Sequence, residues 1–433
     1  MNNKPFLYFI CCVSAMGGLL FGYDWVVIGG AKPFYELFFN ISNDSVMQGV
    51  AMSTALVGCL FGAMVAGAAA DRYGRKPLLI TAAVLFTVSA VATGWFNDFT
   101  LFNIARFVGG VGIGVASALS PMYIAEVSPS EIRGRMVSIN QMTIVLGILA
   151  AQVVNMLIGQ GVSTEWGKET GWRWMFWAET IPAALFLIMS FFIPESPIFL
   201  KMKSDRATIG NNLTDKATSE VKKPLSLLLH PSFRKILVLG LVIAVFQQWC
   251  GTNVIFNYAQ EIFSGAGYDI DGMFMDIVIT GIANVIFTIV AIYTVEKWGR
   301  RTLMLIGSCG LGIIYLILGT CYFMEVKGFL MVVLVVAAIS CYAMTLGPIT
   351  WVLLSEIFPN KVRGIAMATC TFALWVGCCT LTFTFPIFNE SLGTYGSFWI
   401  YSLICLCAFV YLFRSCPETK GKSLEELEHE LTK

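Results

Sequence analysis

The feature that most constrains the fold is a succession of long apolar runs that carry almost no charge. A helix needs about 20 apolar residues to cross the hydrocarbon core of a bilayer, and lipid tolerates no exposed, unpaired backbone. We therefore predict an all-α membrane protein with twelve transmembrane helices. The runs lie near 6–31, 46–70, 77–95, 100–124, 136–159, 172–194, 234–262, 273–295, 302–323, 328–355, 365–387 and 396–413.

Composition supports lipid as the solvent of this chain. Only 13% of its 433 residues are charged, whereas soluble domains carry about 25%. A net charge of +1 offers no basic surface for nucleic acid. The 13 cysteines form no CxxC pair, so neither a metal site nor a redox motif is predicted. Since no nucleophile–base pair or nucleotide motif occurs either, we expect no enzyme and no cofactor.

The glycine-rich stretch 109–114 lies inside an apolar run and does not fit the spacing of a phosphate loop. We expect it to serve close helix packing, as do Gly58 and Gly62 at GxxxG spacing.

The longest polar stretch separates the sixth run from the seventh and divides the chain into halves of six. We predict an N-terminal bundle over 1–194, a cytoplasmic linker with short helices over 195–233, a C-terminal bundle over 234–414 and a tail over 415–433. Lysine and arginine mark the cytoplasmic side of spanning proteins. With both termini cytoplasmic, the outward loops hold only Lys32, Lys168, Arg173 and Lys327. Both termini are therefore predicted to be cytoplasmic.

An internal repeat supports two related halves. The sequence DRYGRK at 71–76 follows the second run, and EKWGRR at 296–301 follows the eighth. Matched loops at matched positions indicate a duplicated six-helix unit, as in many secondary transporters. Charged residues recur with it and could form a network that latches helix ends in an outward-facing state, or could only enforce topology. These are Arg75, Glu126 and Arg133 in the first half, and Arg300, Glu356 and Arg363 in the second.

Several motifs occur in order along nearly the whole chain. They are GGLLFGYD at 17–24, DRYGRKP at 71–77, RFVGGVGIGVASALSPMYIAE at 106–126, PESP at 194–197, QQWCGTN at 247–253, GPITWVLLSEIFP at 347–359 and PETKG at 417–421. With these motifs the chain resembles the sugar porters of the major facilitator superfamily, in particular bacterial proton-coupled symporters of the xylose type. The resemblance implies a monomeric carrier of the bacterial inner membrane, moving xylose or a hexose by alternating access.

Two charges lie inside apolar runs, where an unpaired charge is costly and usually functional. Asp24 of the first run and Arg106 of the fourth could neutralise each other. The resemblance implies that Asp24 is the proton site, and a static ion pair that fixes helix packing is the alternative. A third buried group, Glu179, matches a family carboxylate near the coupling route, or serves as a structural hydrogen-bond partner.

A sugar site needs amides for hydroxyls and an aromatic face for the C–H surface of the ring. Gln247, Gln248 and Asn253 form such a cluster, unless they only join helices. The resemblance adds further contacts, which are Gln141, Asn284, Trp351 and Trp375. The chain departs from the family pattern at Asn257, where relatives usually carry tyrosine, and at Leu374, where xylose and glucose carriers usually carry an amide. Both departures predict an altered sugar preference.

Two other functions remain open. A passive uniporter of a sugar, or of a polyol such as inositol, would need no titratable group in the position of Asp24. A sugar sensor that kept the carrier fold would typically carry a long cytoplasmic extension, and fewer than twenty residues follow Arg414.

Overall fold

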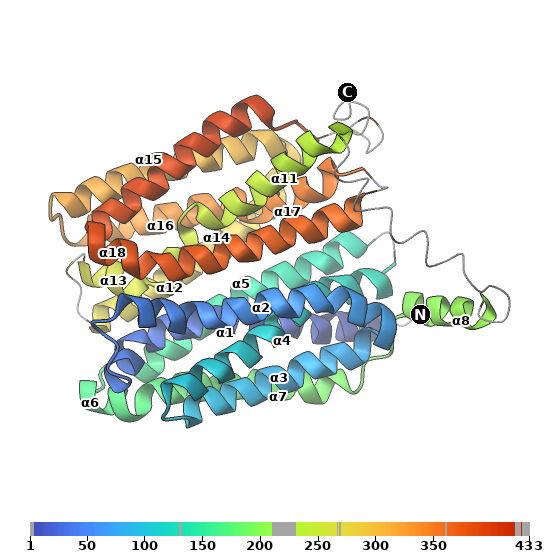
Figure 1. Ribbon diagram of the computed structural model, residues 1–433, viewed down its shortest axis with the longest axis horizontal. Coiled ribbons are helices and arrows are strands. Elements are labelled where there is room, and N and C mark those ends of the chain that lie inside the picture. The colour runs from blue at the N-terminus through green and yellow to red at the C-terminus, as the bar shows by residue number, and fades with distance from the viewer. Residues whose placement is uncertain are drawn as a thin grey trace. The chain divides into compact units, whose positions relative to one another are not determined.

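The computed structural model describes residues 4–129, 132–209, 231–265, 267, 270–359, 362–420 and 426, and no strand occurs among them. The chain divides into two compact units (Figure 1). The first contains Met1–Asn211, Phe256–Ser264 and Tyr268–Gly281, and the second contains Asn212–Ile255, Gly265–Gly267 and Ile282–Lys433.

The first unit is built from long helices that pack in pairs, α1 on α5, α2 on α4 and α3 on α7. Aspartates cap two of these helices: Asp44 accepts from the backbone N–H groups of Val46 and Met47, and Asp98 accepts from that of Leu101. The elements are α1 (Lys4–Phe38), α2 (Ser45–Tyr73), α3 (Arg75–Trp95), α4 (Phe99–Val127), α5 (Arg133–Gly159), α6 (Thr164–Trp166), the π-helical turn η1 (Gly167–Gly171), α7 (Trp172–Ser190) and α8 (Pro197–Ile209). The rest of the predicted linker, 210–230, lies outside the described residues.

Glycines set the close approach of α2 and α4, as predicted for 109–114. A Cβ at Gly110 would lie 1.9 Å from the carbonyl oxygen of Ala55, and one at Gly58 would lie 2.2 Å from that of Phe107. The two backbones therefore touch at these positions, and any side chain would push the helices apart.

The seventh predicted span is not one helix. It consists of α11 (Pro231–Trp249), α12 (Thr252–Asn257) and α13 (Ala259–Gly265), followed by α14 (Ile270–Trp298). The first break falls at Gly251, whose φ of +89° is a conformation that glycine adopts without strain. The chain also passes from the second unit to the first at Phe256, so this span contributes to both units.

The second unit contains α15 (Arg300–Phe323), α16 (Phe329–Met344), α17 (Leu346–Ile357) and α18 (Arg363–Ser415). α18 packs along both α11 and α15 (Figure 1). The tenth predicted span breaks between α16 and α17 at Thr345, whose φ and ψ are −124° and −89°. Pro348 follows shortly and has no N–H to continue the ladder of α16.

The prediction of twelve spans in an all-α protein is confirmed. Ten helical stretches of the described chain are long and apolar enough to cross a membrane. One of them, Ile365–Ser415, bends at Gly393, where φ is 71° and ψ is 170°, and so provides the last two spans. The 19-residue helix α7 lies at the sixth predicted run.

One placement was wrong. Lys32 was expected in an outward loop after a first span ending near residue 31. It lies instead inside α1, which continues to Phe38, and its side chain is only 2% exposed. A lysine near the end of an apolar run predicts the end of a span, and the sequence does not show the contact with Glu261, which lies 229 residues away.

Candidate functional site

A buried ion pair joins α1 to α4 inside the first unit. Arg106 donates through Nη1 to the carboxylate of Asp24 and through Nη2 to the backbone oxygen of Asp24, at 3.3 Å. Both side chains are about 2% exposed. The guanidinium also lies 5.4 Å from the centre of the Phe176 ring on α7. A glycine at 17 lets α1 come this close to α4, because a Cβ there would lie 2.5 Å from Ser120 Oγ.

Glu179 on α7 belongs to the same cluster. It is 2% exposed, and its carboxyl interacts with both Asp24 and Arg106. Two carboxyls thus lie within electrostatic range of one guanidinium, and Oδ2 of Asp24 is buried without a partner in hydrogen-bond geometry among the described residues. A site of this composition is one proton short of neutrality, which is chemistry suited to binding and releasing a proton.

A first charge cluster ties together the ends of α3, α4 and α8. The Arg75 guanidinium contacts the Glu126 carboxylate twice, at 3.0 Å from Nε to Oε2 and 2.9 Å from Nη2 to Oε1. The hydroxyl of Ser196 donates to the same carboxylate. Glu195 accepts from the backbone N–H groups of Arg75, at 2.9 Å, and Lys76, at 3.2 Å. A carboxylate in this place caps the start of α3 and complements its helix dipole.

The second unit repeats this cluster. Arg300 Nη2 contacts Glu356 Oε1 at 3.1 Å, and the Thr419 hydroxyl donates to Glu356 Oε2 at 2.5 Å. Glu418 accepts from the backbone N–H groups of Arg300, at 3.0 Å, and Arg301, at 3.2 Å. The side chains of the two further predicted members, Arg133 and Arg363, lie outside the described part of the structure.

The capping glutamates and their neighbouring hydroxyls were missed in the sequence. The signal was present, since PES at 194–196 and PET at 417–419 stand at equivalent positions of the two halves. The glycine of each preceding loop fits the same arrangement. Gly74 has φ +103° and Gly299 has φ +84°, and a Cβ at either would lie within 2.6 Å of the capping carboxylate.

The predicted amide cluster is connected within the second unit. Asn253 donates to Gln248, Gln248 donates to Gln247 at 2.6 Å, and Gln247 donates to the hydroxyl of Tyr342 at 2.5 Å. Tyr342 was not predicted. This chain of donors and acceptors on α11, α12 and α16 has the chemistry that sugar hydroxyls require.

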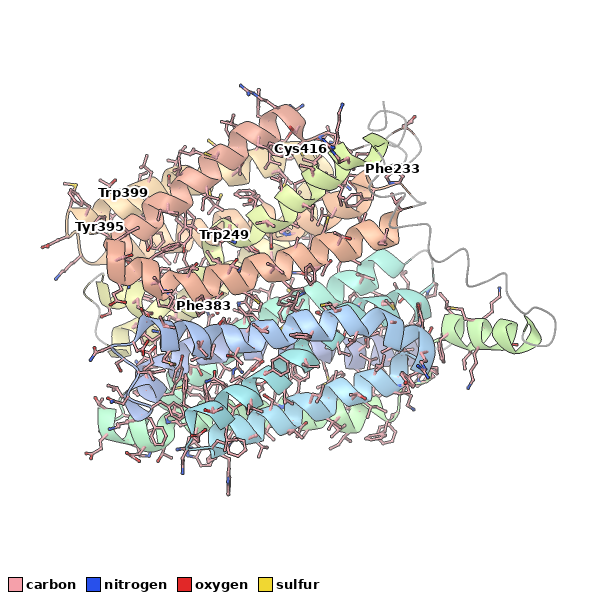
Figure 2. The ribbon with its side chains drawn as sticks, in the orientation of Figure 1. Phe233, Trp249, Phe383, Tyr395, Trp399 and Cys416 are labelled. Carbon is pink, nitrogen blue, oxygen red and sulfur yellow. The ribbon has the colours of Figure 1, made fainter. Side chains whose placement is uncertain are left out.

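The other predicted sugar contacts differ in exposure. Asn284 and Trp375 are buried, whereas Trp351 is 38% exposed. Gln141 is half-buried on α5, in the first unit. Near Trp375, the indole nitrogen of Trp249 donates to the Gly377 carbonyl at 2.9 Å and fixes α11 against α18 (Figure 2). The two departures from the family pattern, Asn257 and Leu374, are both buried.

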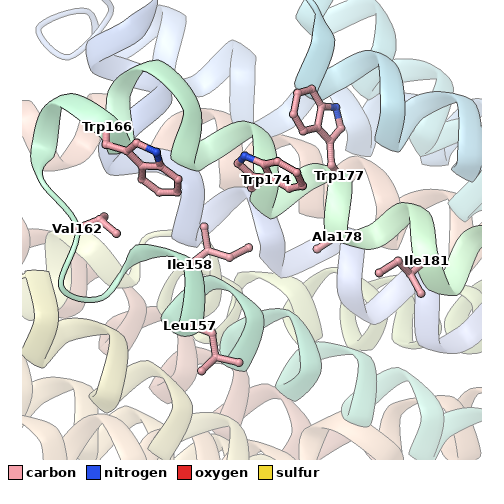
Figure 3. Close-up of a pocket in the computed structure, with 8 residues that line it drawn as sticks. All are labelled: Leu157, Ile158, Val162, Trp166, Trp174, Trp177, Ala178 and Ile181. Atoms are coloured by element: carbon pink, nitrogen blue, oxygen red, sulfur yellow. The ribbon is translucent and has the colours of Figure 1, made fainter.

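An apolar pocket of about 610 Å³ opens at the ends of α5, α6 and α7 (Figure 3). Its lining side chains include no charged or amide group, and tryptophan offers only a donor, so the pocket lacks the side-chain acceptors that sugar hydroxyls also need. Exposed tryptophans on adjacent helix ends are typical of the membrane–water interface. Its lining residues are Leu157, Ile158, Val162, Trp166, Trp174, Trp177, Ala178 and Ile181.

Comparison with known proteins gives consistent matches over nearly the whole chain. The profile of the family described as "Sugar (and other) transporter" matches residues 10–431. The arabinose-proton symporter of Bacillus subtilis (strain 168) is 36% identical, over 99% of this chain and 95% of that protein. The D-xylose-proton symporter of Escherichia coli (strain K12) is 36% identical, over 98% and 96%.

Solved structures agree with these matches. The inward-open conformation of the xylose transporter XylE from E. coli superposes with a TM-score of 0.85 at 35% identity, covering 98% of this chain and 99% of that one. A crystal structure of a D-xylose-proton symporter gives a TM-score of 0.84 at 36% identity, covering 96% and 99%.

Proposed function

Because this chain belongs to the sugar (and other) transporter family, we propose that it moves a monosaccharide together with a proton by alternating access. It is a multi-pass protein of the bacterial inner membrane, and a transporter rather than an enzyme. The relatives are named for xylose and arabinose, and a pentose or hexose is the substrate class that we propose here.

The observation that carries this proposal is the buried cluster of Asp24, Arg106 and Glu179. Deprotonated Asp24 is held by Arg106 across α1 and α4. Protonation removes the charge of Asp24 and with it most of the attraction, so the balance between two packings of the unit changes. Uniport of a sugar or of a polyol such as inositol would need no such group, and a sugar sensor would need no coupling.

The sugar contacts in this proposal are the seven polar and aromatic residues predicted from the sequence. The amide chain of Gln247, Gln248 and Asn253 supplies both donors and acceptors to hydroxyls. The aromatic rings cover the C–H face of the ring. The remaining contacts are Gln141, Asn284, Trp351 and Trp375.

The two charge clusters are proposed to lie on the cytoplasmic side, where both termini also lie, and to latch helix ends while the carrier faces outward. Each joins the start of one helix to the end of another by several charge-assisted hydrogen bonds. Arg133 and Arg363 are proposed to complete the clusters. The functional carrier is proposed to be a monomer.

The test is uptake of radiolabelled sugars into proteoliposomes, with and without an imposed inward proton gradient. A charge that crosses 100 mV carries about 2.3 kcal/mol, which corresponds to roughly fifty-fold accumulation. Wild type is expected to concentrate one of xylose, arabinose, glucose, galactose or inositol only under the gradient. Asp24→Asn is expected to exchange that sugar without concentrating it.

Asp44→Asn is the matched control. Asp44 is exposed at the start of α2, and asparagine caps helices as well as aspartate does, so this variant should concentrate the sugar like wild type. If wild type and Asp24→Asn both bring the sugar only to equal concentrations on the two sides, the protein is a uniporter and the coupling proposal fails.

A further inference from the structure

A second buried cluster of charges lies in the first unit, between α1 and α13. The Lys32 ammonium lies 2.8 Å from Oε1 of Glu36, one helical turn later, and donates a hydrogen bond to Glu261 of α13. It also lies 5.4 Å from the centre of the Tyr258 ring. Three ionisable groups thus meet where the C-terminal part of α1 packs on α13, at a place that the coupling cluster does not use.

A glycine on α1 allows this close contact between α1 and α13. A Cβ at Gly29 would lie 2.9 Å from the carbonyl oxygen of Phe256 and 3.1 Å from that of Asn257. Only glycine therefore lets α1 approach the junction between α12 and α13 this closely. Lys32 follows Gly29 by three residues, on the same side of the helix, and so reaches the start of α13.

The charges of this cluster do not balance. Lys32 is 2% exposed, Glu36 is 5% exposed, and the side chain of Glu261 is 20% exposed. Two carboxylates and one ammonium leave a net charge of −1, and a buried uncompensated charge is costly. Glu36 Oε1 has no partner in hydrogen-bond geometry in the described part of the chain, despite its contact with Lys32, and Glu261 Oε2 has none either.

Among the residues that the structure describes, the neighbouring groups do not supply the missing positive charge. The charged groups close enough to interact electrostatically with the Glu36 carboxyl are Lys32 and Glu261. The two phenols nearby, Tyr35 on α1 and Tyr258 before α13, are neutral. Arg106 acts on Tyr35, but it is already engaged by Asp24.

We propose that Lys32, Glu36 and Glu261 form a second proton-binding site, separate from the pair of Asp24 and Arg106. The site takes one proton from water and shares it between its two carboxyls. With the proton bound, one carboxylate pairs with the ammonium, the other group is a neutral carboxylic acid that can donate a hydrogen bond, and the cluster is neutral.

The site can be tested without sugar or a proton gradient, so its failure is distinct from failure of the transport proposal. The protein is purified in lipid nanodiscs as the Asp24→Asn variant, which removes the first proton site. The C=O stretch of protonated carboxyls is then followed by infrared spectroscopy during a pH titration. A second substitution, Glu36→Gln or Glu261→Gln, is then added to this parent variant. Subtracting the spectrum of the double variant from that of the parent cancels the signal of Glu179, because both proteins contain it.

The charge balance predicts a distinct result for each variant. Either glutamine substitution leaves one ammonium and one carboxylate, so the protonated-carboxyl band seen at neutral pH in the parent should be lost. Lys32→Met leaves two carboxyls without a cation, so the band should double. Glu165→Gln removes an exposed carboxylate in α6 and should leave the neutral-pH spectrum unchanged.

Three results would overturn the proposal. One is a neutral-pH band unchanged in both glutamine variants. Another is a parent band that disappears when sodium replaces potassium at constant pH, since the occupant would then be a metal cation. The third concerns the swapped variant Lys32→Glu/Glu261→Lys, which retains one cation and two carboxyls. This variant is included because the single variants could misfold. If it folds but does not show the neutral-pH band, the site is also refuted.

Discussion

The packing of α4 against α2 and α3 allows a graded test of how tightly these helices fit together. A Cβ at Gly110 would lie 1.9 Å from the Ala55 carbonyl oxygen, and one at Gly112 would lie 3.2 Å from the Leu85 side chain. At Gly67, on the exposed side of α2, a Cβ would have nothing within 4 Å. Alanine substitutions at these three positions add the same methyl group to a helix and differ only in what that group meets.

The expected free energies follow from two opposing effects. Alanine is favoured over glycine in a helix interior by about 1 kcal/mol, so Gly67→Ala should be neutral or stabilising. At Gly110 ordinary contact begins at 3.4 Å, so α4 must move by roughly 1.5 Å. Overpacking of this kind typically costs about 1–3 kcal/mol, which outweighs the gain in helix propensity. At Gly112 the two effects should nearly cancel.

Displacement of α4 also reaches Asp24 and Arg106, the proposed coupling pair. Gly110 lies one turn after Arg106, so a shift of the helix at Gly110 moves the guanidinium relative to Asp24. We therefore expect Gly110→Ala to lose proton-driven accumulation as well as stability, whereas Gly67→Ala keeps both.

Thermal unfolding can be followed with a thiol-reactive fluorophore, because buried cysteines such as Cys59, Cys250 and Cys370 become accessible only on unfolding. Tm should fall in the order Gly67→Ala, Gly112→Ala, Gly110→Ala, with the last a few degrees below wild type. If Gly110→Ala unfolds at the same temperature as Gly67→Ala, or above it, the close backbone contact does not exist as described.

Three further predictions concern single contacts. Arg106→Lys replaces a guanidinium that binds both the carboxylate and the backbone oxygen of Asp24 by a single ammonium. The loss of one charged hydrogen bond is worth about 1.5–3 kcal/mol. Gradient-driven uptake should therefore fall roughly tenfold to a hundredfold, with sugar exchange retained. Ser196→Ala and Thr419→Val each remove a hydroxyl bound to a partly buried glutamate. Both should therefore lower Tm to a similar extent, and a large effect in one half alone would contradict equivalent clusters. Gly251→Ala places a side chain on a residue with φ +89°, and its Cβ lies 2.8 Å from the Tyr401 ring. This should cost about 1–3 kcal/mol of stability and lower Tm. Gly377→Ala, whose added Cβ has only ordinary contacts from 3.5 Å, should leave Tm unchanged.

Much of the fold could be predicted because hydropathy is a local property. Twelve apolar runs fixed the number of spans, and charges inside such runs are rare enough to single out Asp24, Arg106 and Glu179. The structure brings these three together across α1, α4 and α7. The breaks at Gly251 and Thr345 were not predicted, since an apolar run interrupted by glycine or followed by proline can also continue as a kinked helix.

The cluster of Lys32, Glu36 and Glu261 was missed for a different reason. Lys32 is neutralised partly by Glu261, which lies 229 residues away in sequence, and no local pattern indicates that contact. A lysine near the end of an apolar run was therefore assigned to a loop. Glu195 and Glu418 were within reach of sequence reasoning, because the PES and PET repeat follows the same internal symmetry as the loops that they cap.

The positions of Glu195 and Glu418 bear on the order in which the protein assembles during synthesis. Domains generally fold as units from the N-terminus while the ribosome is still working. The first cluster has all of its described members once residue 196 has been made. The cluster of the second half needs Glu418 and Thr419, which follow the last span. The second half can therefore complete its cluster only after its last span has been made, so a ribosome that stalls before residue 418 leaves this cluster without two of its members.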